Sequence, residues 1–148
     1  MKKSVILIIG IVYIVSIVIV GFFGGKMQVY NPTIYVEDIS YTIQGEGVRR
    51  IELTLEAKLE QGCDDYYIVP FSGDSTTIGI KCEVIPQNAT NALIDFYFNA
   101  PKNVECSHEN NNASITFREE LKMVYVTIQS TDGTNLRKVL KLLSSPRQ

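Results

Sequence analysis

The sequence contains no tryptophan, one histidine and three cysteines in 148 residues. No C-x-x-C pair occurs, and a structural zinc site takes about four cysteine or histidine ligands, so no metal centre is indicated. A glycine-rich phosphate-binding loop and a nucleophile elbow are also missing. We therefore expect a protein that is not an enzyme, that needs no cofactor and that has no evident small-molecule substrate.

An excess of charge of one sign is also missing. The chain has 14 basic and 16 acidic residues, for a net charge of −2, and no run of lysine and arginine. Nucleic-acid-binding surfaces need a basic patch. Nucleic acid is therefore excluded as an expected partner.

Charge is absent altogether from residues 4–23, a stretch of twenty apolar or small residues. A bilayer is crossed by about 20 such residues in a helix, and within lipid a helix satisfies its own backbone groups. Lys2 and Lys3 precede the stretch, whereas only Lys26 follows closely. The positive-inside rule then predicts a single-pass helix in the cell membrane, with a cytoplasmic N-terminus and an extracytoplasmic C-terminal domain.

The same stretch could instead be a cleaved signal peptide. Such peptides have an apolar core of about 7–15 residues and a small-x-small cleavage site. Here the core is longer and no alanine follows it, so we expect residues 1–25 to form an uncleaved signal anchor. Gly21, Gly24 and Gly25 are small, and a cut near Gly25 stays open as the alternative.

The remaining residues, 26–148, are enough for one domain, and most of them alternate between apolar and polar. Alternation predicts strands with one solvent-exposed face, and the segments between them are rich in turn formers, as in a β-sandwich or barrel. The side chains expected to face the core are Ile51, Leu53, Leu55, Ala57 and Leu59; Ile78, Ile80, Cys82 and Val84; Ile94, Phe96 and Phe98; Ala113, Ile115 and Phe117; and Val124, Val126 and Ile128.

Two segments depart from simple alternation. Around Glu37 and Asp38 the pattern changes phase, which indicates a bulge or a strand that crosses between sheets. Residues 135–143 fit a helix by the spacing of their leucines, yet Asp132-Gly133 is a hairpin signal that requires a returning strand. We expect the strand and leave the helix open.

Two stretches, "CEVIPQNATNALIDFYF" and "VYVTIQSTDGTN", carry a family resemblance. Their matching residues are Pro86, Asn88, Ala89, Thr90 and Asn91 in the first stretch, and Ser130, Asp132 and Gly133 in the second. Together they resemble the group 2 bacterial immunoglobulin-like domain, a module of intimin- and invasin-type surface adhesins, over roughly residues 78–143. The resemblance implies an immunoglobulin-like antiparallel β-sandwich with a structural or binding role and no catalytic residues. The longer region before Thr77 implies added strands or an insertion.

Tyr97 and Tyr125 fall on the face opposite the apolar sets and should be partly exposed. Exposed tyrosines are favoured in recognition surfaces, although they also cover sheet faces as cross-strand pairs. We take them as a candidate interaction face. The expected partner is another envelope protein or polymer, in addition to the membrane contacted by residues 4–23.

Three clusters have a chemical and a structural interpretation. A Cys82–Cys106 disulfide with one free thiol fits the odd cysteine count, and so do three reduced thiols. Cys106-Ser107-His108 contains a nucleophile and a base, but neighbours along a chain rarely face each other. Acidic residues at positions 64, 65 and 74 could bind calcium if their loops met, and we expect solvated loop acids instead.

The sequence as a whole predicts an all-β, immunoglobulin-like sandwich behind one transmembrane helix. Its expected function is that of a membrane-anchored extracytoplasmic module with a non-catalytic structural or protein-interaction role. The alternative is an accessory subunit of a larger membrane complex, whose helix packs on partner subunits.

Overall fold

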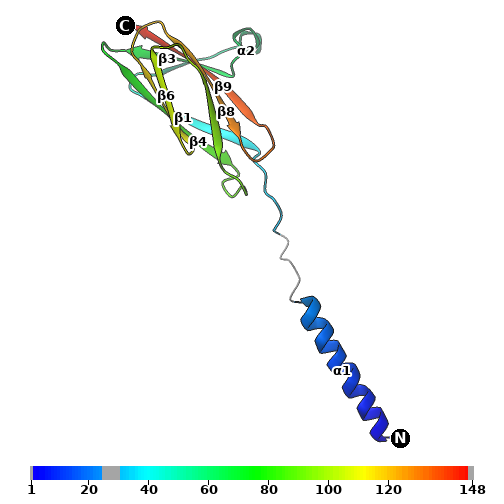
Figure 1. The fold of residues 1–148 in the computed structure, drawn as a ribbon. Helices are drawn as coiled ribbons and strands as arrows, with labels where there is room; N and C mark the ends of the chain where they lie inside the picture. The colour runs from blue at the N-terminus through cyan, green and yellow to red at the C-terminus, as the bar shows by residue number, and fades with distance from the viewer. Residues whose placement is uncertain (1, 25–30, 147–148) are drawn as a thin grey trace. The chain divides into compact units, whose positions relative to one another are not determined.

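The computed structural model describes residues 2–24 and 31–146, and its chain divides into two units, Met1–Pro32 and Thr33–Gln148 (Figure 1). The first unit contains helix α1 (Lys2–Gly24). Its segment Ser4–Phe22 is long and apolar enough to cross a membrane by length and composition, and none of it is buried within the described chain. The cleavage position considered near Gly25 lies outside the described residues.

The second unit is mostly β-structure, arranged as two sheets (Figure 1). The four-stranded sheet has the order β1 (Asp38–Gln44), β4 (Thr76–Ile85), β7 (Asn112–Phe117), β6 (Val104–Glu109). The five-stranded sheet has the order β2 (Arg49–Ile51), β3 (Asp65–Phe71), β9 (Arg137–Pro146), β8 (Met123–Ser130), β5 (Ile94–Asn99). Neighbouring strands are antiparallel except β3 and β9, which run parallel.

One hydrophobic core is shared by both sheets. Alternate residues of each strand point inward, so the apolar sets predicted for residues 78–84, 94–98, 113–117 and 124–128 are confirmed. Phe98 is the one member of these sets that is only partly buried. The buried core consists of Val36, Ile39, Val69, Phe71, Ile78, Ile80, Cys82, Val84, Ile94, Phe96, Val104, Ala113, Ile115, Phe117, Val124, Val126, Ile128, Leu140 and Leu142.

The strand predicted for residues 51–59 is wrong. Only Arg49–Ile51 pair as β2, and helix α2 (Leu55–Gln61) follows. Its residues are strong helix formers, Thr54 caps its N-terminus by accepting a hydrogen bond from the Ala57 amide, and Gly62 ends it at φ 64°. Leu55 and Leu59, expected in the core, are 82% and 83% exposed.

The last segment forms the predicted strand, because β9 returns antiparallel to β8. Asp132 helps to close the connecting turn by accepting a hydrogen bond from the Thr134 amide at 3.1 Å. The positive φ angles fall at Gly133 (91°) and Asn135 (56°) rather than at Asp132 and Gly133. The turn is therefore longer than a two-residue hairpin loop.

The phase change near Glu37 marks the start of β1. Val36 and Ile39, three residues apart, are both buried, and residues 33–37 lie before the strand and do not belong to it. Two hydrogen bonds with Thr90 fix this lead-in segment: the Ile34 amide donates to Thr90 Oγ1 at 2.8 Å, and the Thr90 amide donates to the Ile34 carbonyl at 2.9 Å. The lead-in segment is thus attached to the loop that carries the first family-like motif.

Candidate interaction face

Tyr97 and Tyr125 lie on the outer face of the five-stranded sheet, away from the core. In the β5–β8 register Tyr97 is opposite Thr127 and Tyr125 is opposite Asn99, so the two tyrosines are diagonal neighbours on one face. Tyr97 is 55% exposed, and Tyr125 is partly buried. The structure therefore brings the two predicted residues together.

A row of three side chains crosses the same face. Lys141 of β9 is opposite Tyr66 on β3 and Tyr125 on β8. Its ammonium nitrogen lies 4.8 Å from the centre of the Tyr66 ring and 5.9 Å from that of Tyr125. Such cation–π contacts are worth about 0.5–2 kcal/mol, more when desolvated, and Lys141 is only 9% exposed.

The end of α2 is fixed to this row by Gln61. The Lys141 ammonium donates a hydrogen bond to Gln61 Oε1, and the Tyr125 hydroxyl donates to the Gln61 carbonyl at 3.4 Å. α2 therefore covers part of the row and leaves the side nearer β5 open. We define the aromatic face as Tyr66, Tyr97, Met123, Tyr125 and Lys141.

The aromatic face is suited to binding rather than to chemistry. Met123 at its border is 41% exposed and, like tyrosine, is enriched in protein interfaces. Tyrosine combines a large apolar ring with a hydroxyl and loses little rotamer entropy on contact. The face thus offers both apolar area and hydrogen-bonding groups.

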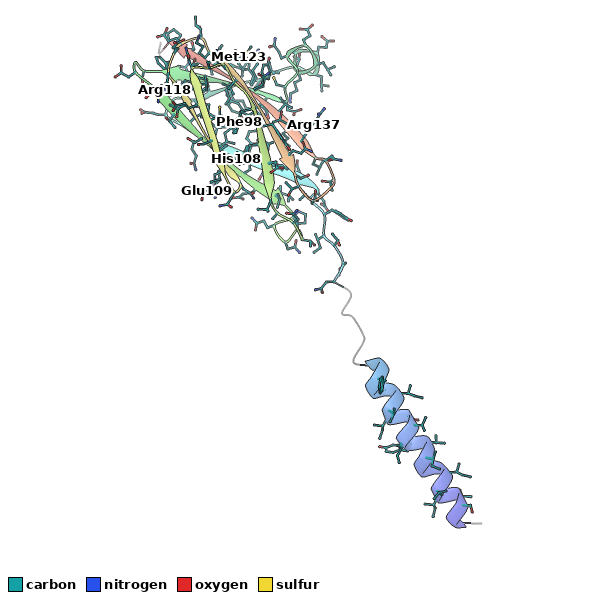
Figure 2. All side chains as sticks on the ribbon, in the orientation of Figure 1. Phe98, His108, Glu109, Arg118, Met123 and Arg137 are labelled. Atoms are coloured by element: carbon teal, nitrogen blue, oxygen red, sulfur yellow. The ribbon has the colours of Figure 1, made fainter. Side chains whose placement is uncertain are left out.

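Cys106, Ser107 and His108 do not form a nucleophile–base pair. They lie on edge strand β6, and Cys106 and His108 lean toward the core side while Ser107 points away from it. The centre of the His108 ring lies 5.8 Å from that of the Phe96 ring. It lies 6.3 Å from that of the Phe98 ring (Figure 2). Burial raises the pKa of the Cys106 thiol, which disfavours the reactive thiolate.

The structure does not bring Cys82 and Cys106 together. Cys82 lies on β4 and Cys106 on β6, with β7 between them. Their levels along β7 also differ, because the Cys82 amide donates to the Asn111 carbonyl whereas Cys106 is opposite Ile115. Both thiols, like that of Cys63, are free, so the geometry does not support the disulfide.

Two of the three acidic residues considered for calcium, Asp64 and Asp65, have other partners, and the third, Asp74, is an exposed loop residue. Asp64 accepts a hydrogen bond from the Val139 amide at 2.7 Å. Asp65 accepts hydrogen bonds from the Tyr41 hydroxyl and the Arg50 guanidinium on the core side. Burial opposes ionisation of Asp65, but these hydrogen bonds outweigh it and lower its pKa. Among residues 2–24 and 31–146, no three His, Cys, Asp or Glu side chains are grouped to hold a metal ion.

The face predicted from the sequence did not include Tyr66, Met123 and Lys141, nor Gln61, which attaches α2 to the aromatic face. Lys141 interrupts the apolar run of residues 139–143. The period of two in a strand places it on the outer face, the face away from Leu140 and Leu142. Gln61 had no such signal, because its role depends on α2.

Comparisons of the chain with protein-family models, with curated proteins and with solved structures found no match.

Proposed function

We propose that the chain is a membrane-anchored, extracytoplasmic, immunoglobulin-like module that binds another component of the cell envelope and catalyses no reaction. The observation that carries the proposal is the aromatic face. It presents Tyr97 at 55% exposure and Met123 at 41% exposure on one side of a sheet whose other side is core. Interfaces are enriched in these residue types.

The strand order supports the immunoglobulin-like part of the proposal. Constant-type immunoglobulin domains have strands A, B, E and D in one sheet and C, F and G in the other. With β1 as strand A and β4 to β9 as strands B to G, the observed orders β1-β4-β7-β6 and β9-β8-β5 correspond to A-B-E-D and G-F-C. β2, α2 and β3 are then the insertion, which agrees with the length of the region before Thr77.

The anchor is supported by physical chemistry. An apolar helix with no buried side chain is costly to expose to water, and its 19-residue span Ser4–Phe22 matches the thickness of a bilayer. The two lysines before the span and the single lysine soon after it favour a cytoplasmic N-terminus.

In-cell photocrosslinking tests the proposal. A benzophenone amino acid replaces Tyr97 or Tyr125, and a matched control replaces Thr42, which is exposed on the outer face of the four-stranded sheet. We expect one defined crosslinked product from positions 97 and 125 and none from position 42. Absence of a product at position 97, or the same product from all three positions, would reject the aromatic face as the interface.

A further inference from the structure

A groove lies at the β2 end of the five-stranded sheet. It has a volume of about 520 Å³, within the usual range for binding sites. Strand β2 contributes Arg49 and Ile51, and β3 contributes Ile68 and Pro70. The remaining lining residues are Glu46, Gly47, Ser72, Ser75, Thr76, Thr77, Ser145 and Pro146. The groove thus combines an apolar floor with several hydroxyl groups and one guanidinium.

The groove lies beside an unpaired sheet edge. In the part of the chain that the structure describes, β2 pairs with β3 on one side and with no strand on the other. The free side of an edge strand presents N–H and C=O groups that an extended peptide can pair with. Because β2 has only three residues, an added strand would contact it over about 10 Å.

Charge distinguishes this edge from the others. The sheets described here have four edge strands, β1, β6, β2 and β5. Three of them carry carboxylates, at Asp38, Asp95, Glu105 and Glu109, whereas β2 carries two arginines and none. Arg50 is paired with Asp65, but no described carboxylate pairs with Arg49. The Arg49 guanidinium is therefore a positive charge in the groove that can pair with an acidic side chain of a partner.

We propose that this groove binds an extended peptide segment of a partner protein as a strand added beside β2. Arg49 and Ile51 are two residues apart and share the outer face, so the matching segment has an acidic and an apolar residue at i and i+2. The acidic side chain pairs with Arg49, and the apolar one contacts Ile51 on the same face of β2. Glu46 also borders the groove and already has an interaction of its own. The inference rests on the proposed function as an interaction module and names the chemistry of one partner.

The test uses the full chain in lipid nanodiscs and two fluorescein-labelled peptides. One has the sequence Thr-Glu-Thr-Val-Thr-Glu-Thr, and the other carries lysine in place of both glutamates. Fluorescence polarisation should show about fivefold tighter binding of the glutamate peptide, the scale of one exposed ion pair. Arg49→Glu should reverse the preference, and Arg137→Glu, at an exposed arginine outside the groove, should leave it unchanged.

Equal affinity for both peptides, no saturable binding of either, or an unchanged preference in Arg49→Glu would overturn the proposal. Arg49 is exposed and makes no described ion pair, so its substitution should not impair folding, which the circular dichroism spectrum checks. The titration uses purified protein and does not depend on the location of the chain in the cell. Its failure would leave the crosslinking test at Tyr97 unaffected, so the two proposals fail separately.

Discussion

Asp132 accepts a hydrogen bond from the backbone N–H of Val36, with 2.6 Å between Oδ2 and the nitrogen. Its other oxygen accepts hydrogen bonds from the amide and hydroxyl of Thr134. One carboxylate therefore joins the turn between β8 and β9 to the lead-in segment of β1. The two family-like motifs also meet here, since the Asn91 side-chain amide donates to the Thr131 carbonyl at 3.1 Å.

Acid should weaken this junction. Burial opposes ionisation of Asp132, yet the hydrogen bonds from Thr134 and Val36 outweigh it and lower its pKa to about 2. The unfolded value is about 3.9, so the folded chain binds the proton less readily than the unfolded chain. The stabilisation is then complete above about pH 4 and is lost as the pH falls toward 2.

Urea unfolding of the wild type and of Asp132→Asn between pH 2 and pH 6 measures this effect. The variant should be less stable at pH 6, and the difference should narrow as the pH approaches 2. Asp74→Asn, at an exposed loop carboxylate, is the matched control. A difference that stays constant over the whole pH range would mean that the charge of Asp132 is not responsible.

Ser144 should be a larger determinant of stability than its size suggests. Ser144 is fully buried. Its hydroxyl donates a hydrogen bond to the Glu119 carbonyl and accepts one from the Lys122 amide, both at 2.9 Å. These two bonds attach the loop between β7 and β8 to β9. Ser144→Ala leaves the Lys122 amide without this partner and should cost about 1–3 kcal/mol. Chemical unfolding measures the loss, and Ser145→Ala should stay within about 0.5 kcal/mol.

The strands were predictable where one side chain in two is buried. Ile78, Ile80 and Val84 follow this period of two. In a strand whose sheet has one face on the core, the order of apolar and polar residues shows which side chains face the core. Strand pairing was not predictable. The parallel contact of β3 with β9 places Lys141 beside Tyr66, and the two are 75 positions apart in the sequence.

Residues 51–59 show why alternation alone can mislead. Leu55 and Leu59 fit a period of two, but they are also four apart and share one face of a helix. The local signals that decide between the two are the Thr54 cap and Gly62, together with the helix propensity of the residues between them. That helix then provides Gln61 to the aromatic face, so an error in local structure also concealed part of the site.

The free energy of unfolding of Leu59→Glu distinguishes the exposed helix from the core strand that alternation predicted. At 83% exposure Leu59 should accept a charge with a change of about 0.5 kcal/mol or less. Ile128→Ala, at a fully buried position, should cost about 2–5 kcal/mol. Urea denaturation compares the two variants, and a loss at Leu59 as large as that at Ile128 would favour the core strand.

Replacement of the helix distinguishes a tethered module from an accessory subunit. If α1 only anchors the domain, an unrelated membrane helix in place of residues 4–22 should preserve the crosslinked product from position 97, because binding depends on the aromatic face. If α1 packs on partner subunits, the exchange should abolish the product while the protein remains in the membrane fraction, since helix packing in lipid depends on specific side chains. The control is Tyr97→Ala on the native anchor with the crosslinker at position 125, which should weaken capture if the aromatic face binds the partner and leave it unchanged if α1 does. Retention of the product with the foreign helix would therefore assign recognition to the β-domain, and its loss would assign recognition to α1.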